Sequence, residues 1–134
     1  NQYRTYGVGR LATIEKSSGS FIGWSGLKYN VGEKEALNGT ENFYDIGYRF
    51  LPRFWGLGFA TESSHKMLRV AFKELNINTV FGAADIDNIG SNKVLRKIGL
   101  NFVEEFSFKE ERINWYRLNK ENYENDYNMC TFNM

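Results

Sequence analysis

The chain contains a single proline, Pro52, and the stretch WGLGFATES follows it at positions 55–63. An aromatic-rich run at 43–51 precedes the proline, and an amphipathic pattern begins within the stretch. Proline stops a strand, and glycines permit a tight turn, so this order predicts a strand, a sharp corner and a helix. Whatever fold the chain adopts must let a strand pass almost directly into a helix.

The helix predicted after the corner covers residues 59–75. Basic residues at 66, 69 and 73 fall on one side of it. Small and apolar residues at three- and four-residue spacings form the other side, which is typical of a helix that packs on a sheet. These residues are Ser64, Met67, Leu68, Ala71, Phe72 and Leu75.

Strand patterns lie on both sides of this unit. Residues 6–14 and 20–28 predict a β-hairpin, and the polar residues 29–42 predict a surface loop. A strand at 78–85 leads to a helix at 89–98, for which Asn88 is a suitable N-cap and Gly99 a suitable terminator. Strands at 101–108 and 113–118 complete the chain, joined by the KEER turn. The order β-β-β-α-β-α-β-β predicts the α/β (α+β) class, with a mixed, mostly antiparallel central sheet around a βαβ core.

Composition sets the broad limits. The 134 residues are 42% hydrophobic and 16% aromatic, which fits one packed domain, and a net charge of +1 offers no case for nucleic acid or an anionic membrane as partner. No apolar run approaches the roughly 20 residues of a membrane span, and no signal peptide is visible. The sole cysteine, Cys130, and the sole histidine, His65, predict no metal site and suit the cytoplasm. Because the chain starts at Asn1 and its first methionine is Met67, we expect it to be part of a longer gene product.

The glycine corner has two interpretations from the residues alone. A helix N-terminus carries unpaired N–H groups, and Gly56, Gly58 and Ala60 leave room for a phosphate to reach them. A glycine-containing turn of this kind is also common with no ligand. The Walker A loop requires Gly-Lys-Ser/Thr, whereas Phe59 follows Gly58 here. The dinucleotide fingerprint lacks its third glycine, so both of these phosphate loops are excluded.

Two motifs carry a resemblance to a known family. WGLGFATE at 55–62 matches a Trp-Gly-x-Gly-x-Ala-Thr-Glu corner, and NIGSNKVLRKIG at 88–99 matches a pattern Asn-x-x-Ser-x-x-Val-Leu-x-Lys-x-Gly. With the pieces FIGWSGL and DIGYRFLP, they closely resemble the GNAT superfamily of acyl-CoA N-acyltransferases, in particular its ribosomal-protein-alanine N-acetyltransferase branch. The resemblance covers about residues 6–118, so we expect one GNAT-like domain over 1–118, without the N-terminal strand and helices of the family. The polar residues 119–134 are expected to form a loosely docked or disordered tail.

The resemblance implies that acetyl-CoA is the co-substrate and that no metal is needed. In the family the corner binds the pyrophosphate through backbone N–H groups, and the strand before it hydrogen-bonds the pantetheine arm. The asparagine before the second helix also contacts this arm, and the serine one turn later lies near the thioester. Carried over by position, the cofactor-binding residues are Tyr48, Arg49, Phe50, Gly56, Leu57, Gly58, Phe59, Ala60, Thr61, Asn88 and Ser91.

The resemblance implies the catalytic residues less completely than the cofactor-binding residues. Many members carry a tyrosine acid seven residues after the asparagine, and some carry a glutamate base five residues before it; here these positions hold Leu95 and Ala83. The remaining candidates for the group that protonates the leaving coenzyme A thiolate are Ser91 and water. Asp45 and Glu62 are candidate bases, as is a water relay. Trp55 stands where many relatives have Gln or Arg.

The implied reaction is direct attack of a primary amine on acetyl-CoA, with a protein N-terminal amine as the favoured acceptor. Acetylation of a small amine, of the polyamine or aminoglycoside type, is the alternative within the same class. A non-catalytic acyl-CoA sensor is the alternative from another class, because the family's acid and base are missing. The expected assembly is a monomer or a homodimer.

Overall fold

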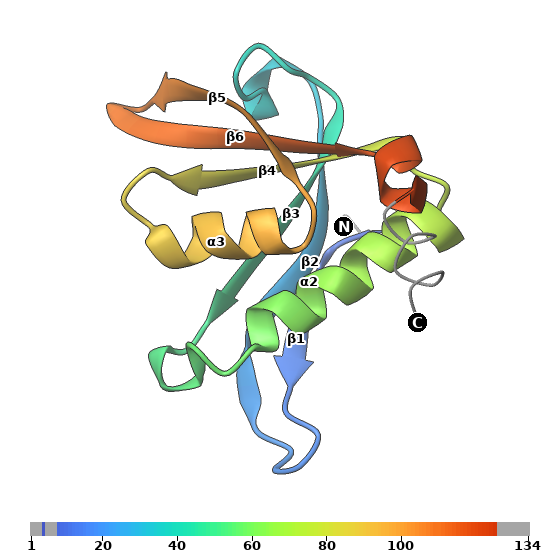
Figure 1. The fold of residues 1–134 in the computed structure, drawn as a ribbon, viewed down its shortest axis with the longest axis vertical. Coiled ribbons are helices and arrows are strands. Elements are labelled where there is room, and N and C mark those ends of the chain that lie inside the picture. Colours follow the sequence, from blue (N-terminus) through green and yellow to red (C-terminus); the bar gives the residue numbers. More distant parts are fainter. Residues whose placement is uncertain (1–3, 5–7, 126–134) are drawn as a thin grey trace.

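The computed structural model describes residues 4 and 8–125 and shows a six-stranded sheet with two helices on one face (Figure 1). The strand order is β1-β2-β3-β4-β6-β5. Neighbouring strands run antiparallel except β3 and β4, which are parallel, so the predicted mixed, mostly antiparallel sheet is confirmed. Residues 6 and 7 of the first predicted strand lie outside the described residues. The strands are β1 (Arg10–Ile14), β2 (Phe21–Asn30), β3 (Phe43–Phe50), β4 (Thr79–Asp85), β5 (Asn101–Phe108) and β6 (Glu111–Asn119).

Helices α2 (Phe59–Arg69) and α3 (Ile89–Lys97) cover the same face of the sheet. Their apolar sides join one core with the inward residues of the strands. Its members are fully or nearly fully buried and include Leu27, Ile46, Leu68, Phe72, Val80, Leu95, Ile98 and Leu118. In the described part of the chain, no helix is long and apolar enough to cross a membrane.

The first helix changes its geometry before it ends. Residues Val70–Glu74 form the π-helical segment η3, in which the N–H of Leu75 donates to the carbonyl of Val70 at 2.9 Å. One extra residue in the turn rotates Leu75 away from the sheet, and it is 39% exposed. The prediction of a regular helix with Leu75 on the buried face was therefore wrong at this end.

The turn between β5 and β6 is tighter than the sequence indicated. Lys109 and Glu110 alone connect the strands, and their φ angles are 48° and 68°. Two residues with positive φ match the twist of a hairpin, so β6 already starts at Glu111. The predicted four-residue KEER turn was thus too long by two residues.

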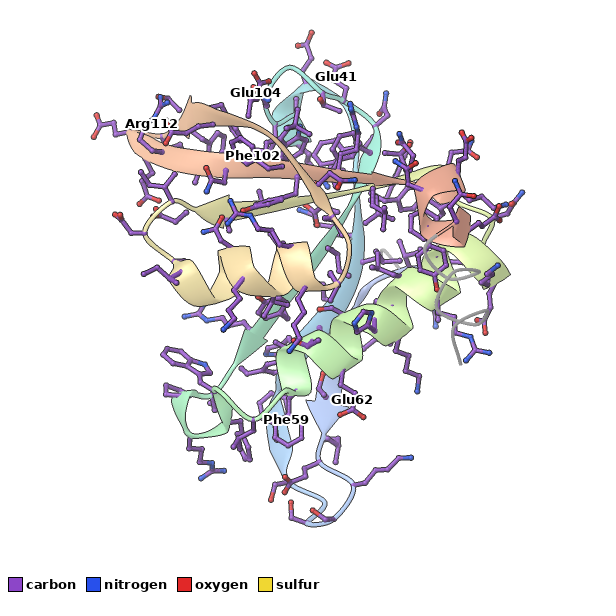
Figure 2. The ribbon with its side chains drawn as sticks, viewed as in Figure 1. Glu41, Phe59, Glu62, Phe102, Glu104 and Arg112 are labelled. Atoms are coloured by element: carbon purple, nitrogen blue, oxygen red, sulfur yellow. The ribbon has the colours of Figure 1, made fainter. Side chains whose placement is uncertain are left out.

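The second face of the sheet carries its own aromatic cluster. Trp115, 2% exposed, stacks on Phe81 at 4.9 Å and meets Phe43 and Phe106 edge-on. The loop between β2 and β3 lies near this end of the sheet, where the Asn38 amide donates to Glu104 at 2.7 Å. Figure 2 shows Glu104 close to this loop.

After β6 the described chain continues to residue 125. Residues 120–125 are helical, and Tyr123 stacks on Phe72 of η3 with ring centroids 4.8 Å apart. A periodicity test misses so short a helix, because contacts to distant segments hold it: besides the Tyr123 stacking, the N–H of Lys120 donates to the carbonyl of Asn78 at 2.8 Å. Residues 120–125 of the predicted tail are therefore helical and packed against η3. Residues 126–134, with Cys130, lie outside the described residues.

Ser64 offers a stability test of the α2 packing. It is 1% exposed, and its hydroxyl has no hydrogen-bond partner among the described residues. We expect Ser64→Ala to raise the free energy of unfolding by about 1 kcal/mol, because it removes an unsatisfied buried polar group. Leu68→Ala, one turn on and fully buried, should lower it by about 2–5 kcal/mol. Chemical denaturation of both variants measures this, and a destabilised Ser64→Ala would contradict it.

Candidate acyl-CoA cleft

The cleft exists because two parallel strands separate. β3 pairs with β4 only at Tyr44 and Asp45, which face Val80 and Phe81. β3 then continues for five more residues to Phe50, and β4 continues to Asp85, with no further pairing between them. The backbone of the second half of β3 is therefore open on this side. Such a strand edge offers N–H and C=O groups to a peptide-like ligand.

The glycine corner closes one end of this opening. Gly56 and Gly58 have φ of 74° and 86°, a left-handed conformation that other residues adopt at a cost. Gly58 is the N-cap of α2 and provides no side-chain cap, so the N–H groups of the first turn keep no partner within the helix. Figure 2 places Phe59 and Glu62 at this end of the helix. The indole N–H of Trp55 donates to the carbonyl of Phe50 at 2.8 Å, which fixes the corner to the end of β3.

The start of α3 forms the other wall. The Asn88 side chain accepts from the N–H of Ser91 at 3.0 Å, which confirms Asn88 as the N-cap. Gly99 follows the helix with φ 106°, as predicted for its terminator. Ser91 is partly buried and lies on the cleft side of the helix.

A buried side chain that the sequence did not single out holds this wall in place. Asn92, 6% exposed, donates to the carbonyls of Asp85 at 2.9 Å and Asn88 at 2.8 Å. Its own carbonyl oxygen accepts from Tyr116 at 2.6 Å and Asn114 at 2.8 Å, both on β6. One amide thus ties α3 to the end of β4 and to β6. Nothing in the sequence around Asn92, four residues after the N-cap Asn88, indicates this network.

Strand edge, corner and helix start enclose a cleft of about 700 Å³. Ten of the eleven predicted cofactor-binding residues line it; the exception is Leu57, which is 63% exposed and is not part of the lining. Six lining residues were not among those predicted: Phe54, Trp55, Gly90, Lys93, Val94 and Lys97. The last four share one side of α3, so their helical spacing was available as a signal. The residues that line the cleft are Tyr48, Arg49, Phe50, Phe54, Trp55, Gly56, Gly58, Phe59, Ala60, Thr61, Asn88, Gly90, Ser91, Lys93, Val94 and Lys97.

The charged residues of this lining are all basic. Arg49 lies on β3, and Lys93 and Lys97 lie one turn apart on α3, whereas neither aspartate nor glutamate is among the lining residues in the described part of the chain. On α2, burial lowers the pKa of His65, and the nearby charge of Lys97 lowers it further. Because His65 does not line the cleft, and its lowered pKa disfavours the charged form, the positive charge of the cleft comes from arginine and lysine. Such a lining favours an anionic ligand.

Asp45 is not brought into the cleft. It lies on the paired part of β3, where one carboxylate oxygen forms an ion pair with Arg10 and the other accepts from the Asn30 amide at 3.1 Å. Arg10 lies directly over Gly47, where a side chain would collide with its guanidinium. Both carboxylate oxygens thus have partners, and this geometry does not favour Asp45 as a base. Glu62 is exposed on α2 and does not line the cleft either.

Two further observations concern ionisable groups elsewhere. Burial raises the pKa of Tyr44, and the neighbouring Tyr29 raises it further; their rings are 4.6 Å apart. This pair packs against the core, away from the cleft lining. Among residues 4 and 8–125, no three His, Cys, Asp or Glu side chains gather in a way that could hold a metal ion.

The fold and the cleft define an acyltransferase-like α/β domain. A family model described as an acetyltransferase (GNAT) domain matches residues 1–101, so the chain belongs to the GNAT acetyltransferase domain family. A relative in Aspergillus fumigatus, named FsC-acetyl coenzyme A-N(2)-transacetylase, is 33% identical over 90 residues. That match takes in 67% of this chain and 38% of the relative, so this chain spans well under two thirds of its length.

Solved structures show the same fold at low sequence identity. A ribosomal-protein-S5-alanine acetyltransferase from Vibrio fischeri has a TM-score of 0.74 and 16% identity, over 90% of this chain and 67% of that one. A spermidine N-acetyltransferase from Vibrio cholerae has a TM-score of 0.74 and 14% identity, over 94% and 73%. At these identities the likeness concerns the fold, and the alanine branch is one neighbour among several.

Asn92 provides a test of how the α3 wall is held. Asn92→Ala removes four hydrogen bonds and leaves the buried Tyr116 hydroxyl without its acceptor, so we expect a loss of about 1–3 kcal/mol in the free energy of unfolding. Ile89→Ala, on the same helix but 79% exposed, is the matched control and should change it by less than about 0.5 kcal/mol. Thermal and denaturant unfolding measure both. Equal effects of the two substitutions would contradict the role of Asn92.

Proposed function

We propose that this protein transfers the acetyl group of acetyl-CoA to a primary amine by direct attack. The observation that carries the proposal is the cleft itself. An open strand edge leads to a glycine corner at an uncapped helix start, and every charged lining residue is basic. Coenzyme A has the matching order of groups, since a peptide-like arm joins a thioester to phosphates. Membership of the GNAT domain family supports the same assignment.

In this proposal the pyrophosphate binds the N–H groups of Gly58 to Thr61 at the start of α2. The pantetheine arm pairs with the open backbone of β3 at Tyr48 to Phe50 and reaches Asn88 at the start of α3. The thioester then lies in the opening between β3 and α3. A backbone N–H of β3 would stabilise the negative charge that develops on the carbonyl oxygen. No metal takes part in this scheme.

The acceptor must be neutral to attack. An α-amine with a pKa of about 8 is partly neutral near pH 7, whereas a lysine or polyamine amine with a pKa of about 10 is almost fully charged. Because the carboxylates of Asp45 and Glu62 lie outside the cleft, we propose a water relay as the base. A cleft without a dedicated base favours an α-amine, as in the alanine branch that the two motifs resemble.

The first prediction on function concerns turnover. We expect acetyl-CoA-dependent release of thiol with an alanine-terminated peptide, and a weaker rate with spermidine. A thiol-detecting assay with both acceptors and an aminoglycoside measures this. A higher rate with spermidine than with the peptide would favour the small-amine alternative. Tight binding of coenzyme A without turnover on any of these amines would favour the non-catalytic sensor.

Substitution of Gly58 tests phosphate binding, and a second glycine variant with a similar expected loss of stability serves as its control. A Cβ at Gly58 meets no atom within 4 Å, so Gly58→Ala costs stability only through its left-handed φ, by about 1 kcal/mol. Gly58 lines the cleft, so under this proposal the added methyl group competes with the phosphate for space at the corner. We expect the dissociation constant for coenzyme A to rise about tenfold or more, from loss of one charge-assisted hydrogen bond.

Gly39→Ala is the matched control for this substitution. Gly39 has φ 71° and an equally open surrounding, but it lies in the loop before β3. The two variants should lose similar stability, while titration calorimetry should show weakened coenzyme A binding only in Gly58→Ala. Unchanged affinity in Gly58→Ala would mean that the corner does not bind the pyrophosphate.

A further inference from the structure

One buried hydroxyl in the cleft, that of Tyr48, makes no hydrogen bond of normal geometry to any described residue, although the Ser91 side chain lies nearby. Tyr48 lies on β3, three residues beyond the last position that pairs with β4. Its ring stacks on Phe50 with centroids 5.8 Å apart, and it lines the cleft. The hydroxyl oxygen is shielded from solvent and makes no hydrogen bond of normal geometry within the described chain. A buried polar group in this state costs free energy unless a ligand satisfies it.

The surroundings keep this hydroxyl protonated. Burial raises the pKa of Tyr48, and the nearby Ser91 side chain lowers it by a smaller amount. The phenol is therefore a hydrogen-bond donor throughout the neutral pH range. It faces the start of α3, on the side of the cleft where Ser91 and Asn88 lie.

The other groups of the cleft that carry protons are placed differently. Lys93 and Lys97 are exposed on α3, and Thr61 belongs to the corner at the start of α2. On α3, the position seven residues after Asn88 holds Leu95, which is 3% exposed and packs in the core. Tyr48 is thus the buried donor in the part of the cleft between the open strand and α3.

We propose that the Tyr48 hydroxyl donates a hydrogen bond, and then its proton, to the sulfur of the departing coenzyme A. This inference rests on the proposed function. It adds a catalytic role for the side chain to the backbone role that β3 has in holding the pantetheine arm. It also assigns Ser91 as the group through which the phenol exchanges protons with water.

The step balances as follows. The neutral amine nitrogen forms a bond to the carbonyl carbon, and the carbonyl electron pair moves to oxygen. When the carbonyl reforms, the C–S bond breaks, its electron pair goes to sulfur, and sulfur takes the proton of Tyr48. The nitrogen loses one proton to water. Water returns one proton to the tyrosine oxygen by way of the Ser91 hydroxyl, which leaves an amide, a thiol and an unchanged enzyme.

The test is Tyr48→Phe in the full chain, which removes the hydroxyl and keeps the ring. We expect kcat to fall about 100-fold, within the range for general acid catalysis, while KM for acetyl-CoA stays unchanged and the unfolding temperature does not fall, because the variant loses only an unsatisfied buried hydroxyl. Tyr44→Phe is the matched control, because it lies on the same strand but outside the cleft lining. It should retain wild-type kcat. A Tyr48→Phe variant with kcat within twofold of the wild type would overturn the proposal.

A second measurement does not depend on turnover. A phenol that donates to sulfur stabilises the thiolate of bound coenzyme A, so the thiolate fraction, followed by ultraviolet absorbance, should fall about tenfold in Tyr48→Phe. The positive charges of Lys93 and Lys97 also stabilise a thiolate, but they are the same in the wild type and in Tyr48→Phe, so they do not contribute to the difference. If the wild type turns over no amine, the transfer function fails, but a lower thiolate fraction in the variant still supports the contact. An equal fraction in both proteins overturns it.

Discussion

The separation of β3 from β4 is the constraint on which the site depends. The two strands share only the pairs made by Tyr44 and Asp45, and beyond them the chain leaves one strand edge unsatisfied. Unpaired backbone groups inside a protein are costly, and here they lie within a cleft where a ligand can complete them. The helix starts on either side would serve no common ligand if the strands remained paired. A single local failure of pairing therefore creates the binding surface.

Keeping the strands apart requires fixed points on both sides of the opening. On the β3 side, the indole of Trp55 holds the Phe50 carbonyl, and the left-handed glycines turn the chain into α2. On the β4 side, Asn92 binds the carbonyls of Asp85 and Asn88 and connects them to β6. In both cases a side chain, that of Trp55 or Asn92, donates hydrogen bonds to backbone carbonyls at the end of a strand or the start of a helix. The cleft thus has two walls that are held independently of any ligand.

Local patterns were sufficient to predict most of the elements. The order of strands and helices, the Asn88 cap, the Gly99 terminator and ten of the residues that line the cleft follow from spacing, turn chemistry and motifs. The π-turn at Leu75 did not follow, because a regular helical periodicity does not register one extra residue in the last turn. The stacking of Tyr123 on Phe72 did not follow either, because it joins segments distant in sequence. Asn92 was missed for the same reason, since its partners lie on β4 and β6. Asp45 shows the reverse case, in which a plausible residue type on the right strand is engaged by Arg10, which no local pattern reveals.

The place of Trp55 gives the protein an internal optical probe. The chain has three tryptophans, and their surroundings differ: Trp115 is 2% exposed, Trp24 is 50% exposed on the hairpin, and Trp55 is 67% exposed at the rim of the cleft. A ligand that fills the cleft takes water away from Trp55, whereas neither Trp24 nor Trp115 lines the cleft. The emission of this one indole therefore reports occupancy of the cleft in the unlabelled protein, against a constant background from the other two.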